Sequence, residues 1–174
     1  DNIGFIGRLK TGSALTDVGL TNVSVAGGYS VGGLVGLNDG TITNSYSTGT
    51  VTGSRDYVGG LVGYNDYGGS IDSSYSTGAV SGTDSVGGLV GYHMYDGTIS
   101  NSYSTGAVTG YYYVGGLVGY KDGGSISHSY STGVVTGAGS VGGLVGVNYA
   151  GSISNSYSTG VVSGGSSQYS AVLG

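Results

Sequence analysis

The sequence predicts an all-β fold, a single-chain parallel β-solenoid (β-helix) of about six coils, with 27–29 residues and about three short strands in each coil. The first observation behind this prediction is a hexapeptide, Val-Gly-Gly-Leu-Val-Gly, that recurs every 27 or 28 residues. It begins at Val31, Val58, Val86, Val114 and Val141. The second is a Ser-Tyr-Ser-Thr-Gly block that alternates with the hexapeptide in a fixed order. The third is the composition, in which Gly accounts for 41 of 174 residues while Pro and Cys are absent.

The composition also excludes several classes of protein. A chain that is 37% hydrophobic and 7% charged has enough apolar surface to fold, and collagen requires a Gly-X-Y period with Pro. The basic residues are only Arg8, Lys10, Arg55 and Lys121, so we expect no binding to nucleic acid or to anionic membrane surfaces. No apolar run approaches the roughly 18 residues of a membrane span, so we expect no membrane insertion.

The chain opens with a degenerate coil, residues 1–30. Ile3-Gly4-Phe5-Ile6-Gly7 resembles a worn hexapeptide, and the segment from Leu15 to Gly27 resembles the second half of a repeat. Residues 31–164 then hold five regular coils.

Each regular coil contains three β-branched segments separated by turns rich in Gly, Asn, Asp and Ser, which favour positive φ and local hydrogen bonds. The hexapeptide is the first segment. A short segment centred on isoleucine is the second, at Ile42, Ile71, Ile99, Ile126 and Ile153. The third contains the tyrosines Tyr46, Tyr75, Tyr103, Tyr130 and Tyr157 and closes on Val51, Val80, Val108, Val135 and Val162. Coils about 4.8 Å apart would stack these residues into structural ladders.

Alternation along the third segment predicts which side chains face the core. Because Val51 and its equivalents are always valine, we expect this position to point inward and the row of Tyr46, Thr48, Thr50 and Thr52 to point outward. A bulge at Gly49 would reverse the tyrosine, so both orientations of the Tyr ladder remain open.

Alternation in the hexapeptide gives a different expectation. Leu34 and Val35 are adjacent, so one of the two apolar ladders is expected to face away from the core. Such a ladder indicates either lateral contact with another chain or a mildly apolar exposed sheet.

Residues 165–174 begin a further coil without a polar cap. Tyr169-Ser170-Ala171-Val172-Leu173-Gly174 starts another hexapeptide, at the phase of the repeat where the chain began. Unpaired strand edges near Val172 and Leu173 would accept another coil, so we expect self-association from head to tail.

The titratable residues predict no enzyme, no cofactor and no metal. His93 and His128 lie at non-equivalent positions, and His128 takes a polar position that is Asn or Ser in the other coils. Four aspartates recur after the hexapeptide (Asp39, Asp66, Asp96 and Asp122), and turn formation accounts for them better than calcium, which needs six to eight oxygen ligands.

The block Gly-Gly-Leu-Val-Gly followed by Asn-Ser-Tyr-Ser-Thr-Gly-x-Val-x-Gly resembles the GLUG repeat of bacterial cell-surface proteins, which include adhesins and some immunoglobulin A peptidases. The resemblance covers Val31 to Gly164 and implies an extracellular or cell-surface, non-catalytic module. We therefore expect a structural protein, either a fibre subunit or an adhesin stalk. The alternatives are an ice-binding solenoid, from rows of Thr, and a carbohydrate-binding module that engages a glycan or host surface through Tyr.

Overall fold

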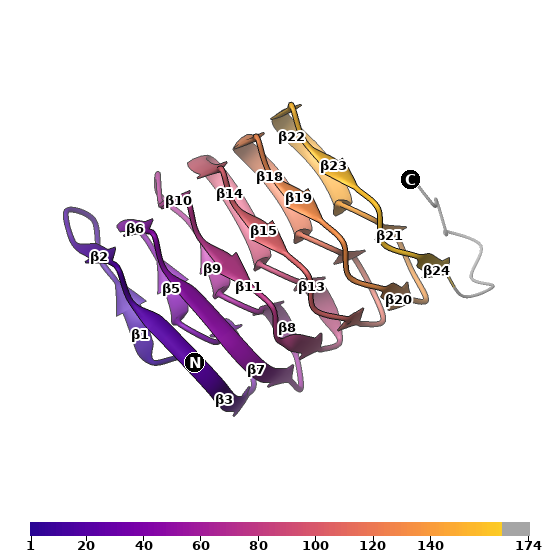
Figure 1. Ribbon diagram of the computed structural model, residues 1–174, viewed down its shortest axis with the longest axis horizontal. Coiled ribbons are helices and arrows are strands. Elements are labelled where there is room, and N and C mark those ends of the chain that lie inside the picture. The colour runs from indigo at the N-terminus through magenta and orange to yellow at the C-terminus, as the bar shows by residue number, and fades with distance from the viewer. Residues whose placement is uncertain (165–174) are drawn as a thin grey trace.

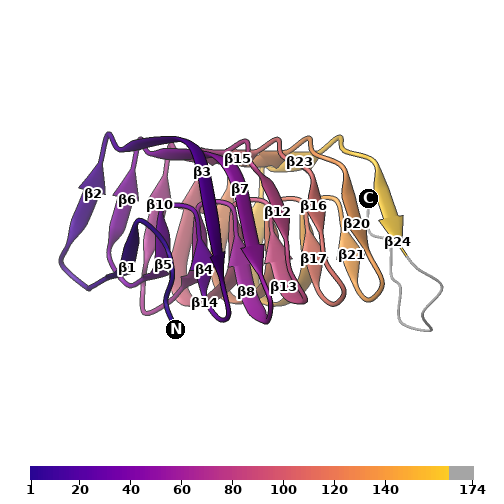
Figure 2. The ribbon, with the colours of Figure 1, turned by 90° about the horizontal axis from the view of Figure 1, so that it is seen from below.

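A computed structural model describes residues 1–164, which form a stack of short strands wound into about six coils. The coils follow one another along a single axis from the N-terminus to the last described strand (Figure 1). Every strand pair is parallel, and the strands belong to three sheets that run along the axis (Figure 2). The predicted parallel β-solenoid is confirmed. No helix long and apolar enough to cross a membrane occurs among residues 1–164.

The strands divide among the three sheets as follows. The nine-stranded sheet contains β1 (Ile6–Leu9), β2 (Ala14–Thr16), β5 (Val35–Asn38), β6 (Thr41–Thr43), β9 (Val62–Asn65), β10 (Ser70–Asp72), β14 (Val90–Ser100), β18 (Val118–Ser127) and β22 (Val145–Ser154). The ten-stranded sheet contains β3 (Gly19–Gly27), β7 (Tyr46–Gly53), β11 (Tyr75–Ser76), β12 (Ala79–Ser81), β15 (Tyr103–Ser104), β16 (Val108–Thr109), β19 (Tyr130–Ser131), β20 (Val135–Gly137), β23 (Tyr157–Ser158) and β24 (Val162–Gly164). The five-stranded sheet contains β4 (Val31–Gly32), β8 (Asp56–Gly59), β13 (Asp84–Gly87), β17 (Val114–Gly115) and β21 (Val141–Gly142).

Equivalent residues of successive coils lie opposite one another in these sheets. Val51 pairs with Val80, Ile42 with Ile71 and Tyr46 with Tyr75, and the same register continues through all the regular coils. The first 30 residues join the same register, since Leu15 lies beside Ile42 and Val25 beside Val51. The degenerate sequence therefore still forms a coil that pairs with its neighbour.

The core consists of two separate apolar columns. The larger column contains the Leu34, Val35 and Ile42 rows, and the smaller contains the Val31 and Val51 rows. The valines predicted to point inward do so: Val51, Val80, Val108 and Val135 are buried, and Val162 is partly buried in the last described coil.

The expectation that Leu34 or Val35 faces away from the core is wrong. Both side chains are fully buried and belong to the same column. The chain bends at Gly33 and Leu34, where β4 ends and β5 has yet to begin. Because the bend resets the alternation, neighbouring residues can point to the same side. The apolar hexapeptide thus gives no reason to expect lateral contact.

A narrow waist separates the two columns. There the second glycine of each hexapeptide meets the inward serine of the opposite wall, and a Cβ added to that glycine would lie 2.2 to 2.7 Å from the serine Oγ. The glycines are Gly33, Gly60, Gly88, Gly116 and Gly143, and the serines are Ser47, Ser76, Ser104, Ser131 and Ser158. Only small residues fit on either side, which explains why the two sequence blocks recur together.

The predicted start of a further coil, with Val172 and Leu173, falls in residues 165–174 and is outside the described residues.

We predict that Gly88→Ala destabilises the solenoid by overpacking the waist. The added Cβ would lie 2.2 Å from both the Gly116 carbonyl oxygen and the Ser104 Oγ. Overpacking of this kind costs roughly 1–3 kcal/mol of the free energy of unfolding, measurable by denaturant titration. Gly28→Ala is the matched control, because a Cβ there meets no atom within 4 Å. Equal free energies of unfolding for the two variants would show that the waist is not tightly packed.

Candidate functional site

The outer surface carries a continuous tyrosine ladder, one ring per coil. Tyr46, Tyr75, Tyr103, Tyr130 and Tyr157 point outward, and their ring centroids are 4.8 to 5.2 Å apart with planes within 6° of parallel. Since each ring lies against the next, the ring faces are covered and mainly the edges meet solvent. The flanking residues alternate as expected, with Ser45 and Ser47 buried and Thr50 and Thr52 exposed. This row stiffens the wall but offers few open aromatic faces to a ligand.

A polar row follows the corner before each tyrosine. Asn44, Ser73, Asn101, His128 and Asn155 all have positive φ, between 48° and 53°. Asn155 Nδ2 lies 3.3 Å from His128 Nε2, so His128 takes part in this row as a hydrogen-bonding substitute for Asn. Asp72 accepts hydrogen bonds from Ser100, Asn101 and Ser73, and these bonds lower its pKa.

A second polar row, which the sequence reasoning missed, lies inside the solenoid. Asn38 donates to Asn65 Oδ1 at 2.7 Å, and Asn65 Nδ2 lies 3.0 Å from His93 Nδ1. Lys121 and Asn148 continue the register in the next two coils. The signal in the sequence was the polar residue that follows each Val-Gly-x, at Asn38, Asn65, His93, Lys121 and Asn148.

His93 and Lys121 are neighbouring basic groups in this interior. Both side chains are fully buried, and Lys121 Nζ donates to the Ala150 carbonyl oxygen at 2.5 Å. Burial, together with the nearby Lys121 ammonium, lowers the pKa of His93 to about 4. Burial also lowers the pKa of Lys121. His93 Nε2 has no hydrogen-bond partner among the described residues, so the imidazole is held neutral.

The four aspartates after the hexapeptide do not converge on one site. Asp39 forms an ion pair with Arg8, with Nη2 and Oδ2 2.6 Å apart. Asp66 closes a turn by accepting from the Gly69 amide, and burial raises its pKa. Asp96 is exposed. No cluster of three potential metal-ligating side chains occurs within residues 1–164.

A second aromatic cluster, also missed from the sequence, flanks the hexapeptide. Tyr57 precedes one hexapeptide and Tyr64 follows it, and their rings lie 5.3 Å apart. Tyr92, Tyr120 and Tyr113 extend the cluster along the axis with contacts of 4.9 to 5.3 Å. Burial raises the pKa of Tyr92 to about 12. The rings pack on one another, so this cluster supports the fold.

One row of exposed apolar residues lies on the outer wall. It consists of Ala79, Ala107, Val134 and Val161, with Thr50 at the equivalent position of the first regular coil, and Val134 and Val161 are 49% and 66% exposed. The chain bends at Gly78, Gly106, Gly133 and Gly160. These bends separate this row from the Thr row beside the tyrosines, so the Thr residues do not share one flat face.

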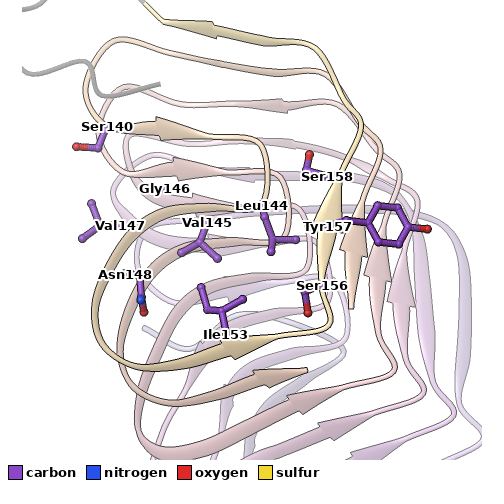
Figure 3. Close-up of a pocket in the computed structure, with 10 residues that line it drawn as sticks. All are labelled: Ser140, Leu144, Val145, Gly146, Val147, Asn148, Ile153, Ser156, Tyr157 and Ser158. Atoms are coloured by element: carbon purple, nitrogen blue, oxygen red, sulfur yellow. The ribbon is translucent and has the colours of Figure 1, made fainter. Parts of the chain in front are cut away.

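A hollow lies at the cross-section of the last described coil. It has a volume of about 740 Å³ and is lined by Leu144, Val145 and Ile153 (Figure 3). Ser156 and Ser158 point toward it, while the Tyr157 ring points away (Figure 3). The lining contains no histidine or carboxylate. Its residues are equivalent to those that pack against the next coil elsewhere in the stack, so the hollow is a stacking position at the last described coil.

Comparison with known proteins agrees with this geometry. The family model described as "The GLUG motif" matches residues 27–52, 54–81, 82–109, 110–136 and 137–163. Halomucin of Haloquadratum walsbyi is 44% identical over 84 residues, which are 45% of this chain and 1% of halomucin. The crystal structure of a protein assigned as an immunoglobulin A1 protease from Bacteroides ovatus superposes with a TM-score of 0.76 and 26% identity, over 91% of this chain and 60% of that one. The chain thus spans about 1% of the length of its curated relative.

We predict that His93 makes the solenoid sensitive to acid. The ordinary pKa of histidine is about 6.5, and in the fold it is lowered to about 4. Between these values the unfolded chain binds a proton that the folded chain does not, so stability falls as the pH falls, by up to roughly 3 kcal/mol. Denaturant titrations at pH 7, 5.5 and 4.5 measure this slope.

His93→Asn should reduce that slope, because it restores the residue found at Asn38 and Asn65 and has no proton to gain. His128→Asn is the control: it also restores an Asn found in the equivalent position, but on the exposed corner. An unchanged acid slope in His93→Asn, or an equal reduction in His128→Asn, would show that His93 is not the sensitive group.

Proposed function

The chain belongs to the GLUG-motif family, and from that premise we propose that it is a non-catalytic structural segment of a secreted or cell-surface protein, serving as a fibre subunit or an adhesin stalk. The observation that carries this proposal is the shared register of the strands in successive coils, which resumes after each local shift. Equivalent valines, isoleucines, serines and tyrosines lie opposite one another from coil to coil. Such a stack forms a rod whose length grows with the number of coils.

The mechanism of such a segment is mechanical. Parallel backbone hydrogen bonds run along the axis between coils, and two apolar columns resist shear between them. About six coils at about 4.8 Å each give a length of about 29 Å. A rod that reaches beyond a cell surface therefore requires further coils, either from the same polypeptide or from another copy.

The partly exposed apolar side chains of the last described coil support end-to-end growth. Leu144, Val145 and Ile153 are partly exposed there, although their equivalents in the four preceding coils are fully buried. An open parallel edge backed by apolar side chains is a template for adding strands. We propose that a further coil fills this position.

The arrangement of titratable groups supports a non-catalytic role. His93 is inside the solenoid and His128 is on an outer corner, and neither is hydrogen-bonded to a carboxylate or serine in the described part of the chain. A hydrolase would need a nucleophile and a base within hydrogen-bond reach of each other. Ice binding is less well supported, because the bends at the wall glycines divide the Thr rows between two surfaces.

End-to-end association gives a direct test. We expect the purified chain at high concentration to form filaments in electron micrographs, with the spacing of about 4.8 Å between coils along the filament axis. Ile153→Lys should block filaments, because it places an ammonium in this stacking position.

Thr109→Lys is the control for added charge, since this residue is exposed on the side wall of β16 rather than at an end. Circular dichroism checks that both variants stay folded. A chain that remains monomeric at high concentration, or filaments that survive Ile153→Lys, would contradict association through this edge.

A further inference from the structure

Two tyrosines at equivalent positions of neighbouring coils form a cleft that the structural role leaves unexplained. Tyr67 lies in the turn between β9 and β10, and Tyr95 lies within β14 at the equivalent turn of the next coil. Their ring centroids are 5.8 Å apart, with the planes tilted by 33°. Together with Gly68 and Asp96 they line a shallow hollow of about 400 Å³ on the outside of the solenoid.

The backbone at both tyrosines is unfavourable for a bulky side chain. The φ angles are 41° at Tyr67 and 50° at Tyr95, in the left-handed region that suits Gly, Asn and Asp. Tyr67 is followed by Gly68, whose φ is 77°, and the Gly69 amide donates to the Asp66 carbonyl oxygen across the turn. Two successive positive φ angles are the pattern of a turn in which Asn-Gly is the favoured sequence.

Burial does not compensate for this strain. Tyr67 is 66% exposed and Tyr95 is 54% exposed. In the following coil the position opposite Tyr95 is Gly123, with φ of 105°. The repeat therefore folds with glycine there, and the tyrosine adds backbone strain without filling the core. Strained residues that pack poorly are characteristic of binding sites held by a rigid scaffold.

The two rings differ from the tyrosine ladder in what they expose. Rings of the ladder are parallel within 6°, so each covers its neighbour. Tyr67 and Tyr95 are splayed and leave their outer faces open to solvent. Met94, the residue before Tyr95, accepts a hydrogen bond at Sδ from the Tyr64 hydroxyl at 3.0 Å.

We propose that Tyr67, Tyr95 and Asp96 form a carbohydrate-binding subsite for a neutral pyranose. The apolar face of the sugar ring would lie on the open tyrosine faces, and two of its hydroxyls would donate to the Asp96 carboxylate. A ring sandwiched between two others needs about 7–8 Å between them, twice an ordinary carbon contact. At 5.8 Å the rings are too close for that, so the sugar lies across the pair and not between its members.

The test measures binding and stability together on the full chain. Arrays of neutral oligosaccharides built from glucose, galactose, mannose or N-acetylglucosamine identify a probe, and calorimetric titration then measures its affinity. Tyr67→Asn and Tyr95→Asn should each weaken binding roughly fivefold to tenfold, as expected for the loss of one aromatic contact. Asp96→Asn should weaken binding while preserving the shape of the loop.

The same tyrosine variants should keep or raise the melting temperature, because Asn tolerates positive φ better than Tyr. Tyr111→Ala is the matched control, since Tyr111 is 53% exposed but lies outside the cleft, and it should bind the probe as the unmodified chain does. Filament formation should be unchanged in all four variants, so a failure of sugar binding can be told apart from a failure of the proposed structural role.

Four results would overturn the proposal. One is that no neutral oligosaccharide binds, or that binding is equal in Tyr67→Asn and Tyr111→Ala. Another is that tetramethylammonium chloride binds the cleft in place of the sugars, which would make it a cation site. The last is a clear fall in melting temperature in Tyr67→Asn and Tyr95→Asn, which would make the ring pair a structural contact.

Discussion

The contact between a hexapeptide glycine and an inward serine of the opposite wall is the constraint on which the rest of this solenoid depends. At the waist a Cβ on Gly88 would lie 2.2 Å from the Ser104 Oγ. The two walls approach so closely that they divide the interior into two apolar columns. Aliphatic side chains from successive coils fill each column. The contact repeats in every regular coil and holds each coil in register with its neighbours. Because the coils share this register, equivalent residues stack into ladders.

Sequence reasoning succeeded where one strand keeps a straight alternation and failed where the chain bends. In β7, Val51 and the serines face inward and Tyr46 faces outward, because the strand keeps its period of two despite the positive φ of Gly49. In the hexapeptide the bend at Gly33 turns both Leu34 and Val35 inward, and alternation alone carries no sign of a bend. The inward Asn38 row was missed because a polar residue beside a turn is usually exposed.

The candidate site was harder to find from the sequence for a different reason. Tyr67 and Tyr95 are two of 17 tyrosines, and their spacing resembles that of the ladder residues. What distinguishes them is positive φ combined with open ring faces. Neither property can be derived from residue identity, since the same turns hold Gly123 in another coil. The interior of the repeat specifies the rod, whereas its loops are free to vary and carry recognition. His93 and Lys121 show that even the interior accepts costly substitutions when neighbouring coils hold the register.

The waist can be tested most directly from its serine side, by comparing Ser104→Val with Thr105→Val. The two residues are adjacent, but Ser104 is fully buried against the hexapeptide and Thr105 is exposed. If the waist sets the phase of the coils, Ser104→Val should lower the free energy of unfolding by roughly 1–3 kcal/mol through overpacking, and Thr105→Val should leave it nearly unchanged. Equal effects of the two substitutions would show that the buried position at the waist is no more tightly packed than the exposed one, and would contradict the account.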